Sequence, residues 1–289
     1  MPILVDENTR VLVQGITGKQ GSLHTLEMIK YGTKVVAGVT PGKGGVRVHG
    51  VPVYNSVSEA LERHPEINTS IIFVPARYAS DAVYEAVDAG LKIVVVITEH
   101  IPAHETLRFV EHALCRGVRV VGPNTPGVIT PGRAKVGIMP GKYFAEGNVG
   151  IMSRSGTLTY EVAAALAKAG IGVSTAVGIG GDPVVGTDFV ETYRLFMEDG
   201  ETDRVVLIGE IGGAKEERFA QYYSSLPAEA RKNVVAYIAG RSAPPGKKMG
   251  HAGAIVYGRS GSYEQKVNAL ESAGIRVARS IQEIPSLLE

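Results

Sequence analysis

The chain contains 289 residues, and this length favours two domains over one, because single hydrophobic cores usually stop growing beyond about 250 residues. Its 30 Lys and Arg residues balance 29 Asp and Glu residues, which argues against a polyanion such as nucleic acid as the main partner. The single cysteine, Cys115, excludes an internal disulfide, and no Cys/His cluster has the spacing of a zinc site, so we expect no metal bound by this chain.

The sequence predicts neither a targeting segment nor a membrane segment. Residues 1–8 lack a basic stretch followed by an apolar one, so no signal or transit peptide is indicated. No apolar run reaches the length that spans a bilayer. We therefore expect a cytoplasmic protein without a membrane partner, or a protein of the mitochondrial matrix if the source is a eukaryote.

In the first part of the chain, short β-branched runs alternate with segments of helical period. The expected strands are 10–14, 34–39, 70–74, 93–97 and 119–121, and the expected helices are 21–31, 79–89 and 104–116. Apolar strands joined by crossover helices indicate a parallel sheet that is buried on both faces. We assign residues 1–125 to this first α/β domain.

The pattern then breaks and starts again. Residues 122–148 are rich in Pro, Gly and polar residues, too long a stretch for an ordinary loop, so we place the boundary there, with 126–148 as a linker. Residues 149–289 form the second domain, which is also doubly wound α/β. Its expected strands are 149–153, 173–177, 205–211, 233–238 and 275–278, and its expected helices are 158–169, 188–198, 215–226 and 263–273.

A glycine loop follows the first strand, at residues 15–21 (GITGKQG). Glycines there let the backbone approach an anionic ligand at a helix N-terminus, which carries roughly half a positive charge. The spacing Gly-x-x-Gly-x-x-Gly differs from the dinucleotide fingerprint and lacks the ending of a P-loop. This loop predicts a phosphate-bearing ligand but does not identify which one.

Lys43 narrows the ligand class. A dehydrogenase would carry an acidic residue at the end of the second strand, to hold the ribose hydroxyls. Here that strand is followed by residues 40–45 (TPGKGG), in which a lysine suits a phosphate. We interpret the ligand as a phosphorylated adenosine without hydride chemistry, although a lysine in such a loop is also common as a solvated surface residue.

The second domain begins with a different candidate anion site. Ser155, Gly156 and Thr157 follow a strand and start a helix, where they offer backbone N–H groups and hydroxyls to a phosphate. Small hydroxylated residues at a helix start also serve simply as caps, so this pattern leaves both interpretations open.

His251 lies in residues 250–254 (GHAGA), a stretch of small side chains that leaves the imidazole without local packing neighbours. The preceding residues 243–249 (APPGKKM) indicate an irregular, basic loop. Glu210 ends a strand in residues 209–213 (GEIGG), and we predict that it lies beside His251. A carboxylate that binds one ring nitrogen fixes the tautomer and leaves the other nitrogen as nucleophile. The ordinary alternatives are a loop histidine without chemical function and a glutamate bonded to a backbone amide.

Five motifs in this order resemble those of the α subunit of succinyl-CoA synthetase, also called succinate–CoA ligase. They are residues 38–45 (GVTPGKGG), 153–160 (SRSGTLTY), 178–183 (GIGGDP), 209–213 (GEIGG) and 250–254 (GHAGA). The likeness runs from about residue 3 to the C-terminus. It implies a Rossmann-like CoA-binding domain followed by a flavodoxin-like, doubly wound ligase domain. One departure is Thr125, where many relatives have cysteine, so no thiol is essential there.

The resemblance also implies roles for individual residues. His251 is phosphorylated during turnover, and Tyr160 lies near the organic acid, at a site shared with a second subunit. The implied CoA contacts are Thr17, Gly18, Lys19, Gln20, Lys43, Ile97, Thr98 and Glu99.

The implied reaction interconverts a nucleoside triphosphate, succinate and CoA with the diphosphate, phosphate and succinyl-CoA, as in the tricarboxylic acid cycle. We find no carboxylate cluster for Mg²⁺ and no region free to fold around a nucleotide. We therefore expect ATP or GTP with Mg²⁺ to be bound mainly by a partner β subunit, in an αβ or (αβ)₂ assembly.

Three other classes of function remain open: a related acyl-CoA ligase, a CoA-sensing regulator and a nicotinamide oxidoreductase. Malate–CoA ligase and an ADP-forming acetyl-CoA synthetase subunit share the chemistry and differ in the acid. A CoA-sensing regulator would need an idle His251 loop. A nicotinamide oxidoreductase is disfavoured, because Lys43 stands where an acidic residue should be.

Overall fold

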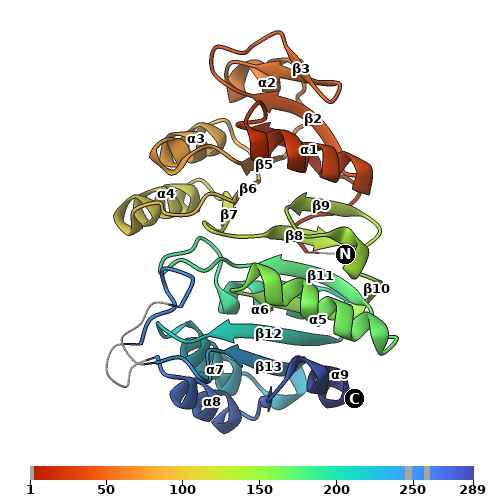
Figure 1. Cartoon of the computed structure of the whole chain (residues 1–289), viewed down its shortest axis with the longest axis vertical. Helices are drawn as coiled ribbons and strands as arrows, with labels where there is room; N and C mark the ends of the chain where they lie inside the picture. Colours follow the sequence, from red (N-terminus) through yellow and green to blue (C-terminus); the bar gives the residue numbers. More distant parts are fainter. Residues whose placement is uncertain (1–2, 245–248, 257–260) are drawn as a thin grey trace.

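A computed structural model of the chain describes residues 3–244, 249–256 and 261–289. These residues form two α/β domains that follow one another along the long axis of the molecule, each built around a seven-stranded sheet (Figure 1). Pro245, Gly246, Lys247 and Lys248 of the predicted basic loop lie outside the described residues.

The first sheet has the strand order of a Rossmann fold. Its strands are β1 (Arg10–Gln14), β2 (Lys34–Val39), β3 (Arg47–Val48), β4 (Val51–Tyr54), β5 (Thr69–Ile72), β6 (Ile93–Val96) and β7 (Arg119–Val121). Their order is β3-β4-β2-β1-β5-β6-β7, with only β3 antiparallel to its neighbour. Without β3, this is the 3-2-1-4-5-6 arrangement of dinucleotide-binding domains.

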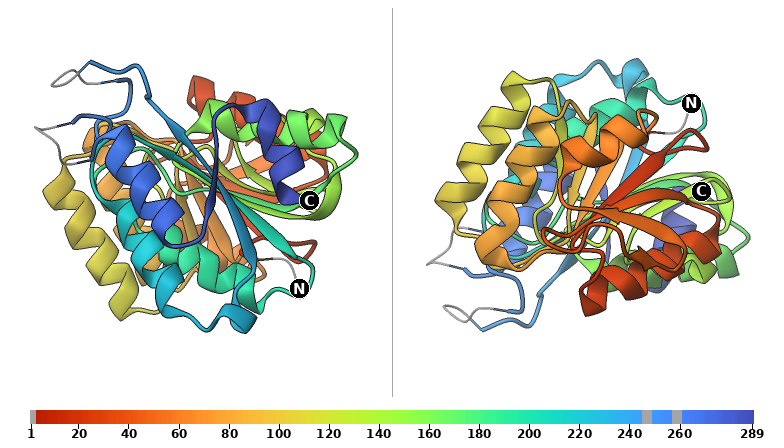
Figure 2. Two further views of the ribbon diagram at one scale, coloured as in Figure 1. Left: turned by 90° about the horizontal axis from the view of Figure 1, so that it is seen from below. Right: turned by 90° about the horizontal axis from the view of Figure 1, so that it is seen from above.

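Helices cover both faces of the first sheet (Figure 2). They are α1 (Lys19–Tyr31), α2 (Val57–Arg63), α3 (Ala76–Asp88) and α4 (Ala103–Cys115). On one face, α2, α3 and α4 pack against a core that includes Leu12 and Ala37, and on the other Met28 of α1 joins Val11 and Val13. Sequence periodicity missed β3, β4 and α2, because these elements are short and follow directly on a glycine loop.

The second sheet has a flavodoxin-like order. Its strands are β8 (Gly127–Thr130), β9 (Ala134–Gly137), β10 (Glu146–Ser153), β11 (Val173–Gly178), β12 (Arg204–Glu210), β13 (Asn233–Ala239) and β14 (Arg276–Ala278). The parallel strands lie in the order β11-β10-β12-β13-β14, which is the 2-1-3-4-5 arrangement of flavodoxin. The antiparallel strands β8 and β9 extend the sheet beyond β11.

The helices of the second domain also lie on two faces. They are α5 (Gly156–Lys168), α6 (Phe189–Glu198), α7 (Lys215–Ser225), α8 (Tyr263–Ser272) and α9 (Ile284–Leu288), with the short 3₁₀ turns η1 (Gly141–Tyr143), η2 (Ala228–Ala230) and η3 (Ile281–Glu283). Apolar side chains of α5 and α9 share one core cluster, whereas those of α6, α7 and α8 share another. The predicted alternation of strands and helices is confirmed here.

Residues 126–148 are more ordered than the expected linker. They contain β8, β9 and η1, and Thr130 Oγ1 donates to the backbone oxygen of Val5 at 2.8 Å. Strands of four residues joined by a Pro-Gly turn give too short an alternation to stand out in the sequence. A single core cluster runs from Val11 in the first sheet to Val177 in the second, so the two domains pack on shared apolar side chains. The domain boundaries themselves stay a prediction.

Candidate active site

Two cavities lie where the strands of the first sheet end. The glycine-loop cavity has a volume of about 760 Å³, and its lining includes Gly15, Thr17, Gly18, Thr40 and Pro41. The backbone there is tightly packed, since a Cβ on Gly21 would lie 2.2 Å from the carbonyl oxygen of Gly15. Two of the expected CoA contacts, Thr17 and Gly18, line this cavity. It lies at the carboxyl edge of the sheet, where open α/β folds bind ligands.

The second cavity, which we call the histidine cavity, lies between the domains and measures about 590 Å³. From the first domain it is lined by Gln20, Ile97, Thr98 and Glu99 among others, and from the second by Ser155, Gly156, Thr157 and His251. The two cavities share Phe73, Val74 and Pro75. The structure thus brings most of the predicted site residues to two adjoining cavities.

Four predicted site residues line neither of these cavities, and one of them, Glu210, contacts His251 as described below. Lys19 and Lys43 are exposed beside the glycine-loop cavity. Asn55 Oδ1 accepts from the backbone N–H groups of Gly42 and Gly44 at 3.0 Å each, which holds the Lys43 loop in its conformation. Tyr160 on α5 stacks on Tyr143, with ring centroids 5.8 Å apart, and both rings lie near the surface.

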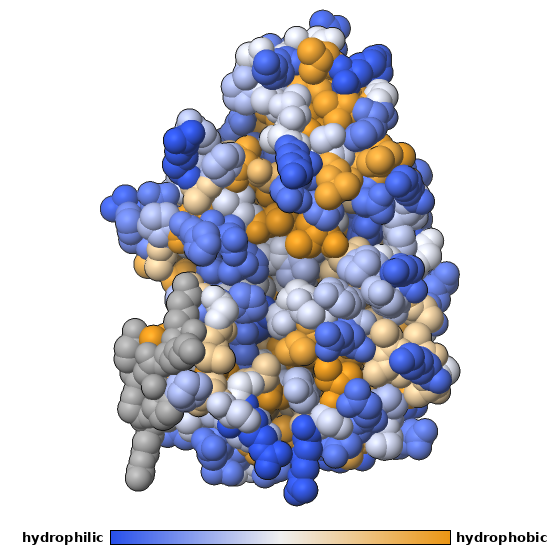
Figure 3. Space-filling model, in the orientation of Figure 1, coloured by the Kyte–Doolittle hydropathy of each residue, from blue (hydrophilic) through white to orange (hydrophobic). Residues whose placement is uncertain are grey.

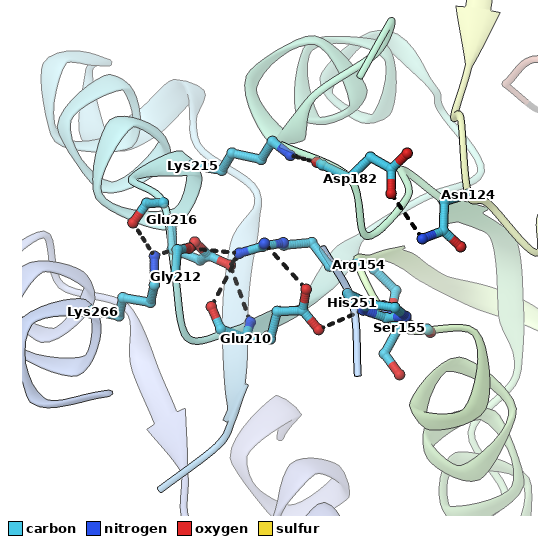
Figure 4. A network of polar contacts seen from close by, with 12 residues as sticks. Asn124, Arg154, Ser155, Asp182, Glu210, Gly212, Lys215, Glu216, His251 and Lys266 are labelled. Atoms are coloured by element: carbon cyan, nitrogen blue, oxygen red, sulfur yellow. Dashed lines mark hydrogen bonds and ion pairs between the residues drawn. The ribbon is translucent and has the colours of Figure 1, made fainter. Parts of the chain in front are cut away.

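His251 contacts Glu210 directly (Figure 4). Its Nδ1 lies 2.8 Å from Oε2 of Glu210, although the two residues are 41 positions apart in the sequence. The hydrogen bond to Glu210 raises the pKa of His251, an effect that burial of the ring partly opposes. Because Nδ1 is bound to the carboxylate, Nε2 is the nitrogen that remains available to a ligand.

The carboxylate of Glu210 is held in turn by a buried ionic network, which sequence reasoning missed (Figure 4). Nη2 of Arg154 lies 3.1 Å from Oε1 of Glu210, and Nη1 lies 3.0 Å from Oε1 of Glu216. Nζ of Lys266 lies 2.6 Å from Oε2 of Glu216. The available signal was the position of Arg154 at the end of a buried parallel strand, where a guanidinium needs a carboxylate partner.

A close approach of two glycine-rich segments places the His251 ring. A Cβ on Gly181 would lie 2.4 Å from Cγ of His251, and the N–H of Gly253 donates to the carbonyl oxygen of Gly181 at 3.2 Å. The neighbouring Asp182 accepts from Nδ2 of Asn124 at 2.9 Å. Glycine at 181 is therefore required by the contact with the imidazole.

The start of α5 is both a capped helix end and a candidate anion site, the two interpretations that the sequence left open. Ser155 Oγ accepts from the N–H of Leu158 at 3.3 Å and so caps the helix. The N–H groups of Gly156 and Thr157 make no hydrogen bond within the described part of the chain, and both residues line the histidine cavity. The helix start is capped and still offers donors to an anion.

Within residues 3–244, 249–256 and 261–289, no group of three or more His, Cys, Asp or Glu side chains could hold a metal ion. In the same ranges, no helix has both the length and the apolar character needed to cross a bilayer.

Family models match both domains. The CoA-binding domain model matches residues 6–100, and the CoA-ligase model matches residues 152–281. In solved structures, the ATP citrate lyase of Methanosaeta concilii resembles 99% of this chain with a TM-score of 0.88, at 24% sequence identity. This chain spans about half of that longer one, 51% of its length, and at this identity the likeness concerns the fold.

Full-length relatives are much closer in sequence. The α subunit 2 of the ADP-forming succinate–CoA ligase of Archaeoglobus fulgidus is 57% identical over 288 residues, which cover 100% of this chain and 99% of the relative. The corresponding α subunit of Staphylococcus aureus is 51% identical over 100% of this chain and 94% of its own length. With both domain models and full-length identities above half, the chain belongs to the family of succinate–CoA ligase α subunits.

Proposed function

We propose that this chain binds CoA and carries a phosphoryl group on His251, within an enzyme that interconverts ATP, succinate and CoA with ADP, phosphate and succinyl-CoA. The observation that carries the proposal is the contact of 2.8 Å between Nδ1 of His251 and Glu210, which leaves Nε2 free at a cavity between the domains. ATP is the proposed nucleotide because the relatives are named as ADP-forming ligases.

In the first step, Nε2 of His251 attacks the γ-phosphorus. The bond from Nε2 to phosphorus forms while the bond from phosphorus to the bridging oxygen of ADP breaks. Charge develops on the ring as this happens, and the carboxylate of Glu210 at Nδ1 stabilises it. The two nitrogens of one imidazole thus have separate tasks.

The start of α5 is the proposed cradle for the transferred phosphoryl group. A phosphoryl group in transit carries negative charge. The N–H groups of Gly156 and Thr157, together with the positive end of the helix dipole, would stabilise that charge. Phosphoryl transfer depends mainly on positioning and charge stabilisation, which is what a helix start provides. Ser155 keeps that start fixed as its cap.

The two adjoining cavities are the proposed site for CoA. Its adenosine and phosphate end would occupy the glycine-loop cavity beside Lys43 and Lys19, and its thiol end would pass Phe73 into the histidine cavity. Phosphohistidine transfers its phosphoryl group to succinate, and the CoA sulfur then attacks the acyl carbon of succinyl phosphate, from which phosphate leaves. Gln20, Ile97, Thr98 and Glu99 are the residues proposed to hold the thiol end.

A partner β subunit is proposed to bind ATP and Mg²⁺. Exposed apolar side chains support a partner, namely Ile138 at 37% exposure, which lines the histidine cavity, and Leu23 at 49% and Tyr143 at 36%, which lie outside it. On the face drawn in Figure 3, apolar groups reach the surface over the region of α1, interspersed with hydrophilic ones. Tyr160, stacked on Tyr143, is then placed to contribute to an acid site shared with that partner. The exposed thiol of Cys115 suits a reducing compartment, and we propose the cytoplasm.

Labelling tests this function. The complex with its β subunit, incubated with γ-labelled ATP, should carry acid-labile, base-stable label on this chain. The His251→Ala variant should carry none. His104→Gln is the matched control, because His104 is exposed on α4 and lines neither cavity, and it should label normally. Label that persists in His251→Ala would contradict the proposal.

A further inference from the structure

His24 is a second imidazole at the histidine cavity, and neither the family motifs nor the proposed phosphoryl transfer uses it. It lies on α1, half-buried, and lines this cavity together with His251. Its ring stacks on Phe73, with centroids 5.7 Å apart and planes 8° from parallel. Phe73 belongs to both cavities, so His24 stands beside the passage that connects the glycine-loop cavity to the histidine cavity.

The ring nitrogens of His24 are uncommitted. Neither makes a hydrogen bond to any residue that the structure describes, whereas Thr98 donates to the backbone oxygen of Val74 and His251 contacts Glu210. Stacking on Phe73 holds the plane of the ring while leaving its polar edge free. A group that enters the cavity can therefore exchange a proton with His24.

Two other titratable side chains line the histidine cavity, Glu99 and His251. His251 is bonded to Glu210 and serves as the proposed phosphoryl carrier. Oε1 of Glu99 lies 3.5 Å from Nε2 of His100, and the Glu99 side chain is 62% exposed to solvent. Of the three groups, His24 alone combines a fixed, half-buried ring with free nitrogens.

An imidazole also matches the chemistry of a thiol better than a carboxylate does. An ordinary thiol has a pKa of about 8.5, an imidazole about 6.5 and a glutamate about 4.3. Proton transfer from the thiol is therefore uphill by roughly two pKa units to an imidazole and by roughly four to a carboxylate. For unperturbed groups the difference is on the order of a hundredfold in equilibrium, and it favours an imidazole over a carboxylate as the base.

Burial and a nearby cation keep the His24 ring neutral. Burial lowers the pKa of His24, the positive charge of Lys135 on β9 lowers it further, and Glu27 on α1 partly opposes both. Lys135 is itself only 4% exposed. A neutral ring can accept a proton at pH 7.

We propose that His24 is the general base that takes the proton from the CoA thiol, a role that rests on the proposed function. The S–H proton passes to a ring nitrogen of His24 while the sulfur attacks the acyl carbon of succinyl phosphate. The bond from sulfur to the acyl carbon forms, and the bond from that carbon to the phosphate oxygen breaks. In the reverse direction, the protonated ring returns its proton to CoA as phosphate displaces the thiolate.

The test uses the His24→Gln variant in the complete complex with its β subunit. Labelling of His251 by γ-labelled ATP should proceed as in the unsubstituted complex. Succinyl phosphate, trapped with hydroxylamine in the absence of CoA, should also form at the normal rate. The formation of succinyl-CoA from phosphorylated enzyme should slow by about 100-fold, the lower end of what general bases contribute. The Kd of CoA, measured by calorimetry, should stay within about twofold.

The pH profile separates a base from a merely positioning side chain. In the unsubstituted complex, succinyl-CoA formation should rise with pH only until His24 has lost its proton and then level off. In His24→Gln it should keep rising towards about pH 8.5, following ionisation of the thiol itself. In a His24→Ala variant, added imidazole should restore part of the lost rate. His104→Gln should match the unsubstituted complex in every measurement.

The outcomes distinguish this proposal from the proposed function. Failure of the unsubstituted complex to phosphorylate His251 would overturn the proposed function. Normal phosphorylation together with an unchanged rate of succinyl-CoA formation in His24→Gln would overturn the base. A slow variant that keeps the pH profile of the unsubstituted complex, and that imidazole does not rescue, would also overturn it.

Discussion

Arg154 and Glu210 form a buried ion pair directly behind the candidate phosphoryl carrier. Nη2 of Arg154 lies 3.1 Å from Oε1 of Glu210, while Oε2 of the same carboxylate lies 2.8 Å from Nδ1 of His251. The Arg154 side chain is 1% exposed and also donates from Nη1 to the backbone oxygens of Glu210 and Gly212. The carboxylate is therefore oriented from both sides, and the imidazole is held in one tautomer.

Replacing Glu210 by glutamine should slow phosphorylation of His251. The amide is nearly the same size as the carboxylate but has no charge with which to stabilise the ring as phosphorus is attacked. A hydrogen bond to a charged group is stronger than one between neutral groups by about 1.4 kcal/mol. Losing this difference in the transition state corresponds to a phosphorylation rate that is lower by about tenfold or more. Rapid-quench labelling in the complex measures this rate, and CoA affinity should not change. A phosphorylation rate equal to that of the unsubstituted complex would remove Glu210 from the mechanism.

Gly181→Ala should displace the His251 ring without unfolding the domain. The added Cβ would lie 2.4 Å from Cγ of His251, closer than any real contact of this kind, so the ring or its loop has to move. We expect at least about a tenfold loss of phosphorylation, since small misplacements of reacting groups are costly. Gly200→Ala is the matched control, because a Cβ there meets nothing within 4 Å. Equal labelling of both variants would show that the contact does not position His251.

Lys43→Ala should weaken CoA binding by about tenfold, through loss of a charge beside a phosphate, an effect worth about 1.4 kcal/mol. Calorimetry at two salt concentrations checks this, and the difference between the variant and the unsubstituted protein should shrink at high salt. Lys34→Ala provides the control, because Lys34 is exposed at the opposite end of β2, away from the loop. A CoA affinity that is the same in Lys43→Ala and Lys34→Ala would discard the contact.

Acid should weaken the network behind the site through Glu216. Burial by itself raises the pKa of this carboxyl group, but Arg154 and Lys266 outweigh burial and lower the pKa from 4.5 to about 2. A lowered pKa contributes stability that is present above pH 4.5 and is lost as the pH falls towards 2. Glu216→Gln should therefore cost about 3 kcal/mol or more at pH 7, as expected for a broken buried pair, and less at pH 3.

Urea unfolding at both pH values measures this difference. Glu201→Gln is the control for a surface pair, since Glu201 contacts Arg133 at 2.8 Å with both side chains at least 35% exposed. It should cost less than about 1 kcal/mol at either pH. A cost of Glu216→Gln that does not fall with pH would show that Glu216 does not titrate as its surroundings require.

Much of the fold could be predicted from local patterns. Apolar runs such as 93–97 and 205–211 are strands because their residues are buried on both faces of a parallel sheet, and the sequence shows this directly. The strands β8 and β9 were missed because four-residue strands around a Pro-Gly turn have no periodicity long enough to detect. Only their pairing with β11 and with each other makes them part of the sheet.

Part of the candidate site could likewise be predicted from local patterns, and part could not. Glycine motifs at strand ends placed Thr17, Gly18, Ser155 and His251 at the carboxyl edges of two sheets, because parallel strands always bring these ends together. The sequence by itself thus determined the order of the longer strands and helices and the family, and it supplied His251 as the candidate phosphoryl carrier. It did not indicate that Tyr160 stacks on Tyr143 away from the cavities.

The tertiary structure decided which charges meet. Arg154 lies 56 residues from Glu210 and 62 from Glu216 in sequence, and Lys266 lies 50 from Glu216. Likewise, the position of His24 at the cavity depends on packing of α1 against Phe73 and β9. Such contacts cannot be read from spacing, because they arise where side chains of separate strands and helices share one buried volume. Their energies depend on that burial, which only the folded chain creates.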